Sequence, residues 1–230
     1  MSLSPLERLT EKLREKIPNG ELALTRLPQC DAIQLWLLDA NYPQWQLSHE
    51  QAAELMDNPP FWSFCWASGQ VLAKQILANP EWVAGRSLLD FGAGSGVVAI
   101  AAKLAGAREV WVCDQDANAL LAAEANAALN GVSLQLCNEL STAPSTDLVT
   151  VADVFYDRDN LPLLATMQKK FGEILMADCR LKGEPLPGLT IVDFQRSHTV
   201  PDLSELDEFN NVYIYRSTGV STQAVDSSTP

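Results

Sequence analysis

The chain has 230 residues, of which 47% are hydrophobic, and a formal net charge of −13; it can bury one substantial core and does not show the basic footprint of a nucleic-acid partner. No apolar run approaches the roughly 18 residues of a membrane span and no signal-like stretch opens the chain, so we expect a cytoplasmic protein without a membrane partner. Only two histidines, and five cysteines without a C-x-x-C pair, disfavour a metal site and indicate reduced thiols.

The first predicted element is an amphipathic helix that begins after Ser4. Ser4-Pro5-Leu6-Glu7 has the pattern of a capping box with proline in the first turn, and apolar residues at positions 6, 9, 13 and 17 share one helical face. Residues 21–40 mix a short alternating piece with an apolar run, and residues 48–56 suit a short helix. We therefore predict an accessory, helical N-terminal segment over residues 1–57.

Four aromatic residues, Phe61, Trp62, Phe64 and Trp66, come next and precede a predicted helix over residues 69–77. They either wall a ligand pocket or pack as ordinary core, and both interpretations stay open at this point. Ser68 stands where a helix N-cap is expected.

Residues 87–96, Ser-Leu-Leu-Asp-Phe-Gly-Ala-Gly-Ser-Gly, predict a buried strand, an acid at its carboxyl end and a glycine turn before an apolar helix over 97–104. Such a turn makes a cofactor seat, and Gly92, Gly94 and Gly96 are the candidate binding residues. Their spacing lacks the third glycine of the dinucleotide fingerprint. An acid followed by G-x-G-x-G instead resembles the first motif of class I S-adenosylmethionine-dependent methyltransferases, which makes Asp90 a neighbour of the donor's sulfonium-bearing amino acid.

A second acid follows at the expected distance. The next apolar run ends in Asp114, twenty residues beyond Gly94, where such folds place a carboxylate on the ribose hydroxyls. Asp116 stands at the N-cap position of the next helix, predicted over 116–130.

The remaining chain alternates between strands and helices. We predict strands over 133–137, 147–152 and 173–178, a helix over 159–170, and a terminal hairpin of residues 189–194 and 212–216. This alternation is typical of a mostly parallel α/β sheet with helices on both faces. Together these elements make a domain over 58–217, and residues 218–230 read as a disordered tail.

Asp153-Val154-Phe155-Tyr156-Asp157 follows the strand predicted over 147–152 and faces the glycine turn across the ligand crevice of an open α/β sheet. A lysine acceptor must lose a proton before it attacks a methyl group, since with a pKa of about 10.4 only about one in a few thousand is neutral at pH 7. We predict that Asp153 orients the amine, and that Tyr156, Phe155 and Trp62 line its channel. The alternative makes Asp153 a helix cap and places Phe155 in the core.

Taken together, the stretches around Trp66, residues 89–96, Asp114 and residues 153–157 resemble the protein-lysine branch of the seven-strand methyltransferases. Within that branch the chain is most similar to the electron transfer flavoprotein β-subunit lysine methyltransferases. The resemblance implies a sheet of order 3-2-1-4-5-7-6 with strand seven antiparallel. It also implies donor contacts at Trp66, Gly92, Asp114 and Asp153, and Asn138 beside the adenine.

We therefore expect an S-adenosylmethionine-dependent enzyme that methylates lysine side chains of a protein, with no nucleic-acid partner and with its oligomeric state undetermined. Two alternatives remain. One is a small-molecule N-methyltransferase of the nicotinamide type, because the fold is shared. The other is a cofactor-binding scaffold without catalysis.

Overall fold

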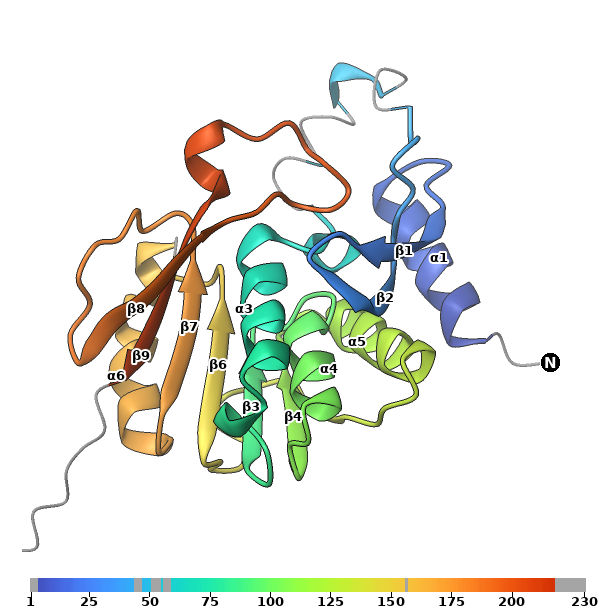
Figure 1. The fold of residues 1–230 in the computed structure, drawn as a ribbon. Coiled ribbons are helices and arrows are strands. Elements are labelled where there is room, and N and C mark those ends of the chain that lie inside the picture. The colour runs from blue at the N-terminus through green and yellow to red at the C-terminus, as the bar shows by residue number, and fades with distance from the viewer. Residues whose placement is uncertain (1–3, 44–46, 51–54, 56–58, 156, 218–230) are drawn as a thin grey trace, which may run out of the picture.

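The computed structural model describes residues 4–43, 47–50, 55, 59–155 and 157–217 (Figure 1). Much of the helix expected over residues 48–56, and the whole of the tail over 218–230, lie outside the described residues. Within the described part of the chain, no helix is both long enough and apolar enough to cross a membrane.

A seven-stranded sheet forms the centre of the molecule. Its strands are β3 (Ser87–Phe91), β4 (Glu109–Cys113), β5 (Gln135–Cys137), β6 (Leu148–Ala152), β7 (Ile174–Asp178), β8 (Leu189–Arg196) and β9 (Asn211–Ser217). Their spatial order is β5-β4-β3-β6-β7-β9-β8, and β9 runs antiparallel to both of its neighbours while the other neighbouring strands run parallel. Counted from β3, this is 3-2-1-4-5-7-6 with strand seven antiparallel, which confirms the predicted fold and the terminal hairpin.

Helices cover the sheet on both faces (Figure 1). The helices that follow the N-terminal segment are α3 (Ala67–Ala78), α4 (Val97–Leu104), α5 (Ala117–Leu129) and α6 (Leu161–Lys170), with single 3₁₀ turns η2 (Phe61–Ser63), η3 (Pro80–Trp82), η4 (Arg158–Asn160) and η5 (Asp207–Asn210). Leu88 packs with α3 and α4, whereas its neighbour Leu89 packs with α6, because successive strand residues point to opposite faces. Both side chains are fully buried.

Two predicted helix caps have different outcomes. Asp116 caps α5 as predicted, since its side chain accepts a hydrogen bond of 2.8 Å from the Asn118 amide. Ser68 is not the cap of α3, because Trp66 occupies that position and Ser68 lies inside the helix. The hydroxyl of Ser68 is bonded elsewhere, as the site shows.

The N-terminal segment is only partly helical, and the prediction of a helical segment is wrong for residues 22–38. Helix α1 (Pro5–Lys16) has the predicted capping box, but residues 22–38 form a hairpin of β1 (Leu22–Leu27) and β2 (Cys30–Leu38). The physical reason is a period of two: the side chains at positions 33, 35 and 37 are all fully buried. Helix α1 packs its apolar face on α5, so the segment shares a core with the sheet domain.

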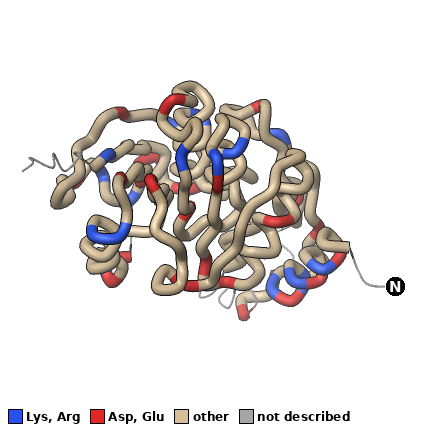
Figure 2. Tube along the Cα trace, turned by 90° about the horizontal axis from the view of Figure 1, so that it is seen from below, with Lys and Arg blue, Asp and Glu red and all other residues tan. Residues whose placement is uncertain are grey.

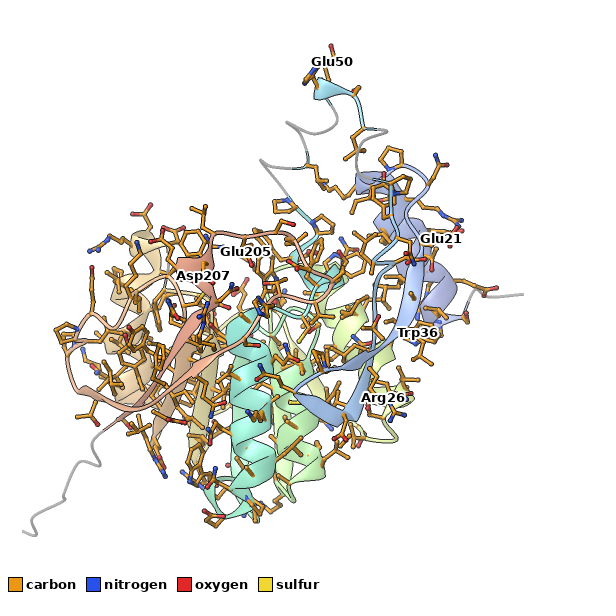
Figure 3. All side chains as sticks on the ribbon, turned by 45° about the horizontal axis from the view of Figure 1, so that its top comes forward. Glu21, Arg26, Trp36, Glu50, Glu205 and Asp207 are labelled. Carbon is orange, nitrogen blue, oxygen red and sulfur yellow. The ribbon has the colours of Figure 1, made fainter. Side chains whose placement is uncertain are left out.

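Acidic and basic positions are interspersed along the chain (Figure 2). On the connection between β8 and β9, where Figure 3 labels Glu205 and Asp207, each of these acids is paired with an arginine. Glu205 is 2.5 Å from Arg180, and Asp207 pairs with Arg196. The negative charge of this connection is therefore partly neutralised from within the chain.

Candidate active site

The three glycines of the turn after β3 all have positive φ, at 68°, 50° and 79° for Gly92, Gly94 and Gly96. An added Cβ would lie 2.6 Å from the Val154 side chain at Gly92 and 2.9 Å from the Ala123 backbone at Gly96. At Gly94 it would meet nothing within 4 Å. Gly96 thus allows α4 to approach α5, whereas Gly94 presents bare main chain to open space.

That open space belongs to a cleft of about 330 Å³, a volume that includes the solvent in its open mouth. Its lining includes Trp66, Asp90, Gly92, Gly94, Ser95 and Ala152. The structure therefore brings together four of the residues predicted to bind the cofactor. The cleft lies at the carboxyl ends of β3 and β6, where the order of the strands reverses.

Asp90 is buried at the floor of this cleft. It accepts hydrogen bonds from the Thr150 hydroxyl at 2.8 Å and from the Ala99 amide in the first turn of α4 at 3.2 Å. Burial raises the pKa of its carboxyl to about 7, against the lowering effect of these two bonds. Asp90 thus ties β3 to β6 and to the first turn of α4 while it lines the cleft.

Asp114 lies against the glycine turn. Its Oδ2 accepts a hydrogen bond of 3.1 Å from the Gly94 amide, and its Oδ1 accepts one of 3.0 Å from the Asp116 amide. Burial raises the pKa of its carboxyl. Gly94 and Asp114, both predicted to bind the cofactor and separated by twenty residues in the sequence, are therefore in direct contact.

Asp153 follows the last residue of β6, Ala152, which lines the cleft, and has φ at +50°. Its Oδ1 accepts hydrogen bonds from the Ser68 hydroxyl at 2.6 Å and from the amide and thiol of Cys179, both at 3.3 Å. Its Oδ2 accepts one bond of 3.3 Å, from the Ser68 amide in the first turn of α3. Burial raises the pKa of this carboxyl, and the bonds from Ser68 and Cys179 oppose the rise.

A second carboxyl, that of Asp178, lies next to Asp153 and is fully buried. Its Oδ1 accepts bonds from the amides of Arg180 and Leu181 at 2.7 and 2.8 Å. Its Oδ2 has no hydrogen-bond partner in the part of the chain that the structure describes. The pKa of Asp178 is raised to about 7, first by burial and then by the neighbouring charge of Asp153.

Two of the residues predicted to contact the substrate are buried in the core. Trp62 is 2% exposed in a core shared with α1 and α5, and Phe155 is fully buried in the core under α6. Both are packing residues here, which was the alternative interpretation, and neither offers a surface to a protein substrate. Asn138 is exposed at the end of β5. Tyr156 lies outside the described residues.

For two residues of the site, the structure adds contacts that the sequence pattern does not give. The first is Asn126, which is fully buried: its Nδ2 donates to the Ser95 carbonyl at 2.9 Å, and its Oδ1 accepts from the Trp36 amide of β2 at 2.7 Å. It ties the glycine turn to the N-terminal hairpin. The second is Phe61, whose side chain is exposed beside Trp66.

Comparisons with known proteins agree with this geometry. A family model described as ribosomal protein L11 methyltransferase (PrmA) matches residues 74–157. The electron transfer flavoprotein beta subunit lysine methyltransferase of Rattus norvegicus is 38% identical over 131 residues, which are 55% of this chain and 50% of that protein. The homolog of that enzyme in Caenorhabditis elegans is 32% identical over 171 residues, 66% of this chain and 68% of that protein. The crystal structure of ribosomal protein L11 methylase from Lactobacillus delbrueckii subsp. bulgaricus shares the fold, with a TM-score of 0.50 at 22% identity over 66% of this chain and 78% of that one.

Three features define a class I, seven-strand methyltransferase: the strand order, the glycine turn, and the carboxylates of Asp90, which lines the cleft, and Asp114, which is bonded to Gly94. Within that class, the chain belongs to the family of electron transfer flavoprotein β-subunit lysine methyltransferases. It spans about half the length of the rat relative.

Proposed function

We propose that this chain is an S-adenosylmethionine-dependent protein-lysine N-methyltransferase, with the electron transfer flavoprotein β subunit as its substrate. The observation that carries the proposal is the open main chain at Gly94, which lines the cleft and is hydrogen-bonded to Asp114. Asp153 directly follows Ala152, another residue of the cleft lining. The names of the relatives support the choice of substrate. We assign the methyltransferase unit to residues 58–217.

The residues at the cleft fit S-adenosylmethionine. Gly94 leaves room for a ligand against the main chain, Asp114 offers a carboxylate next to that room, and Trp66 offers an aromatic ring. When bound, the cofactor supplies a methyl group to a neutral amine and leaves as S-adenosylhomocysteine. These residues would hold it without a phosphate-binding site, which agrees with the lack of a dinucleotide fingerprint.

Asp153 is suited to receive the amine. Its Oδ1 is engaged by three donors, whereas among the described residues its Oδ2 accepts only one bond, of 3.3 Å, and can take another. Because burial raises the pKa of this carboxyl, Oδ2 is a better proton acceptor than that of an exposed aspartate. We infer that Asp153 orients the lysine ammonium and takes up its proton, so that the neutral amine can attack the methyl carbon.

The test is intact-mass analysis of unmodified electron transfer flavoprotein β subunit after incubation with this protein and S-adenosylmethionine. We expect mass increments of one or more methyl groups with the wild-type protein and a strongly reduced yield with Asp153→Asn. Asn keeps the shape and tolerates the positive φ but cannot accept the proton. An unmodified β subunit beside methylated nicotinamide in a parallel reaction would favour the small-molecule alternative.

Two further statements stay predictions from composition: a location in the cytoplasm, and the lack of a nucleic-acid or membrane partner. Fractionation of cells that express the tagged protein tests the first of them.

A further inference from the structure

Three aromatic rings form a row from the core to the surface at the start of α3. The Phe64 side chain is buried, Trp66 is half-buried and lines the cleft, and Phe61 is 46% exposed. The ring centroids of Phe64 and Trp66 are 5.8 Å apart, and those of Trp66 and Phe61 are 5.7 Å apart, with tilted ring planes. These separations are those of interacting aromatic pairs.

The position of Phe61 is set by its own turn. Its carbonyl accepts a hydrogen bond of 3.0 Å from the indole N–H of Trp66, and the hydroxyl of Ser63 is bonded to the Pro60 carbonyl at 2.8 Å. The neighbouring Trp62 is buried in the core and anchors the turn. Because the indole N–H is used within the chain, what Trp66 can offer a ligand is its ring.

Phe61 differs from other exposed phenylalanines in what lies next to it. Single exposed apolar residues are ordinary on protein surfaces, and Phe194 on the edge strand β8 is exposed to the same extent, at 47%. Phe61, however, stacks on a ring that lines the cleft, and Asp153 is bonded to Ser68, two residues beyond that ring. An aromatic face and a carboxylate together suit an alkylammonium group.

We propose that Phe61, with Trp66, is the aromatic contact for the acceptor lysine and determines how well already methylated lysine is accepted. The inference rests on the proposed function and deepens it. An ammonium group that carries methyl groups donates fewer hydrogen bonds to Asp153 and is less well hydrated, so it depends more on an aromatic face than unmodified lysine does. Phe61 thus favours the later methyl transfers over the first.

The test uses four variants of the full chain. Phe61→Ala and Phe61→Leu remove the aromatic face, Phe61→Tyr keeps it, and Phe194→Ala removes an equally exposed phenylalanine from β8. For each we would measure kcat and KM on unmodified and on monomethylated electron transfer flavoprotein β subunit. We would also record the distribution of methyl groups by intact mass and the affinity for S-adenosylhomocysteine by calorimetry.

We expect Phe61→Ala and Phe61→Leu to lower kcat/KM on the monomethylated substrate by about 5- to 30-fold, mainly through KM. The loss on unmodified substrate is expected to be smaller, products with fewer methyl groups should accumulate, and affinity for S-adenosylhomocysteine should stay within about twofold. Phe61→Tyr and Phe194→Ala should match the wild type. Wild-type behaviour of Phe61→Leu, or equal losses on both substrates, would overturn the inference while leaving the proposed function intact. If the wild-type protein itself transferred no methyl group to the β subunit, the proposed function would be wrong, and this inference with it.

Discussion

The hydroxyl of Ser68 donates a hydrogen bond of 2.6 Å to the carboxylate of Asp153, which lies 85 positions away in the sequence. The bond joins the first turn of α3 to the end of β6, and the Ser68 amide donates to the same carboxylate. A carboxylate at a helix N-terminus is stabilised by unpaired amides and by the helix dipole. The carboxylate proposed as the proton acceptor is therefore held by the helix that begins directly after Trp66.

Replacing Ser68 by alanine tests this relationship. The side-chain bond from Ser68 is the strongest influence that lowers the pKa of Asp153, so its loss should raise that pKa further. The acidic limb of kcat/KM against pH should then move to higher pH, and the free energy of unfolding should fall by about 1–3 kcal/mol. pH-rate profiles and urea unfolding measure the two effects.

The matched control is Ser63→Ala. Ser63 is equally buried, and its hydroxyl donates a hydrogen bond of 2.8 Å to the neutral carbonyl of Pro60. It should lose stability without moving the pH profile. Coincident acidic limbs in Ser68→Ala, Ser63→Ala and the wild type would show that the bond does not tune Asp153.

The glycine turn supports a second prediction, because its glycines have different surroundings. Alanine at Gly94 meets no atom within 4 Å but sits at φ +50°, and alanine at Gly131 meets none either, at φ +68°. Each substitution should cost about 1–2 kcal/mol of backbone strain. Only Gly94→Ala projects a methyl group into the cleft, so it alone should weaken binding of S-adenosylhomocysteine. We expect its dissociation constant to rise by about tenfold or more, because the methyl group displaces the ligand from the main chain.

Urea unfolding first shows whether Gly94→Ala and Gly131→Ala lose the same stability. Calorimetry on both variants then distinguishes the effect of backbone strain on ligand affinity from the effect of a methyl group in the cleft. Equal affinities in the two variants would mean that the cofactor does not approach the main chain at Gly94.

The fold was predictable because its signals are local. The apolar run before Asp90, the glycine turn and the apolar helix after it are contiguous, and the same pattern recurs along the chain at spacings that a parallel sheet requires. The hairpin over residues 22–38 was missed because its alternation is short and β1 is only partly buried, so the pattern of β1 is weak. Short apolar runs do not distinguish a helix from a strand.

The site was predictable only in part, because much of it depends on contacts between distant residues. Asp114 and Gly94 were found from a recurrent spacing, but no spacing relates Ser68 to Asp153 or Asn126 to Trp36. Among adjacent aromatic residues, the sequence does not say that Trp62 points into the core and Phe61 out of it. That choice is made by the geometry of a single 3₁₀ turn.

Asn126 is the subject of a third prediction. Replacing it by aspartate keeps the acceptor for the Trp36 amide but puts a second acceptor against the Ser95 carbonyl, in a fully buried site. An unmatched buried acceptor costs about 1–3 kcal/mol, and more when it is charged. We expect a loss of stability of at least that size and faster hydrogen exchange in both β2 and the glycine turn, measured by mass spectrometry.

The control is Asn118→Asp, in the first turn of the same helix, where an acid is favourable. Equal stability of the two variants would contradict the bridging role of Asn126.

The last prediction concerns the dependence of stability on pH. The pKa of Asp178 is raised to about 7 in the folded protein, whereas an aspartate in the unfolded chain has a pKa near 3.8. Between these values the folded state binds more protons than the unfolded state, so stability falls as pH rises from about 4 to 7 and levels off above that. The buried Asp90, whose pKa is also raised to about 7, contributes in the same direction.

Asp178→Asn should remove part of this slope. The asparagine oxygen can keep the bonds from the Arg180 and Leu181 amides, and the atom it changes, Oδ2, has no partner among the described residues. The variant should therefore be more stable than the wild type at pH 8, on the order of a few kcal/mol, and nearly equal to it at pH 4. Urea unfolding across this range measures both. The control is Asp202→Asn, an exposed acid whose Oδ1 likewise accepts an amide bond, from Ser204. A profile of Asp178→Asn that runs parallel to those of the control and the wild type would mean that Asp178 is ionised throughout, and that its buried charge is compensated in the folded protein.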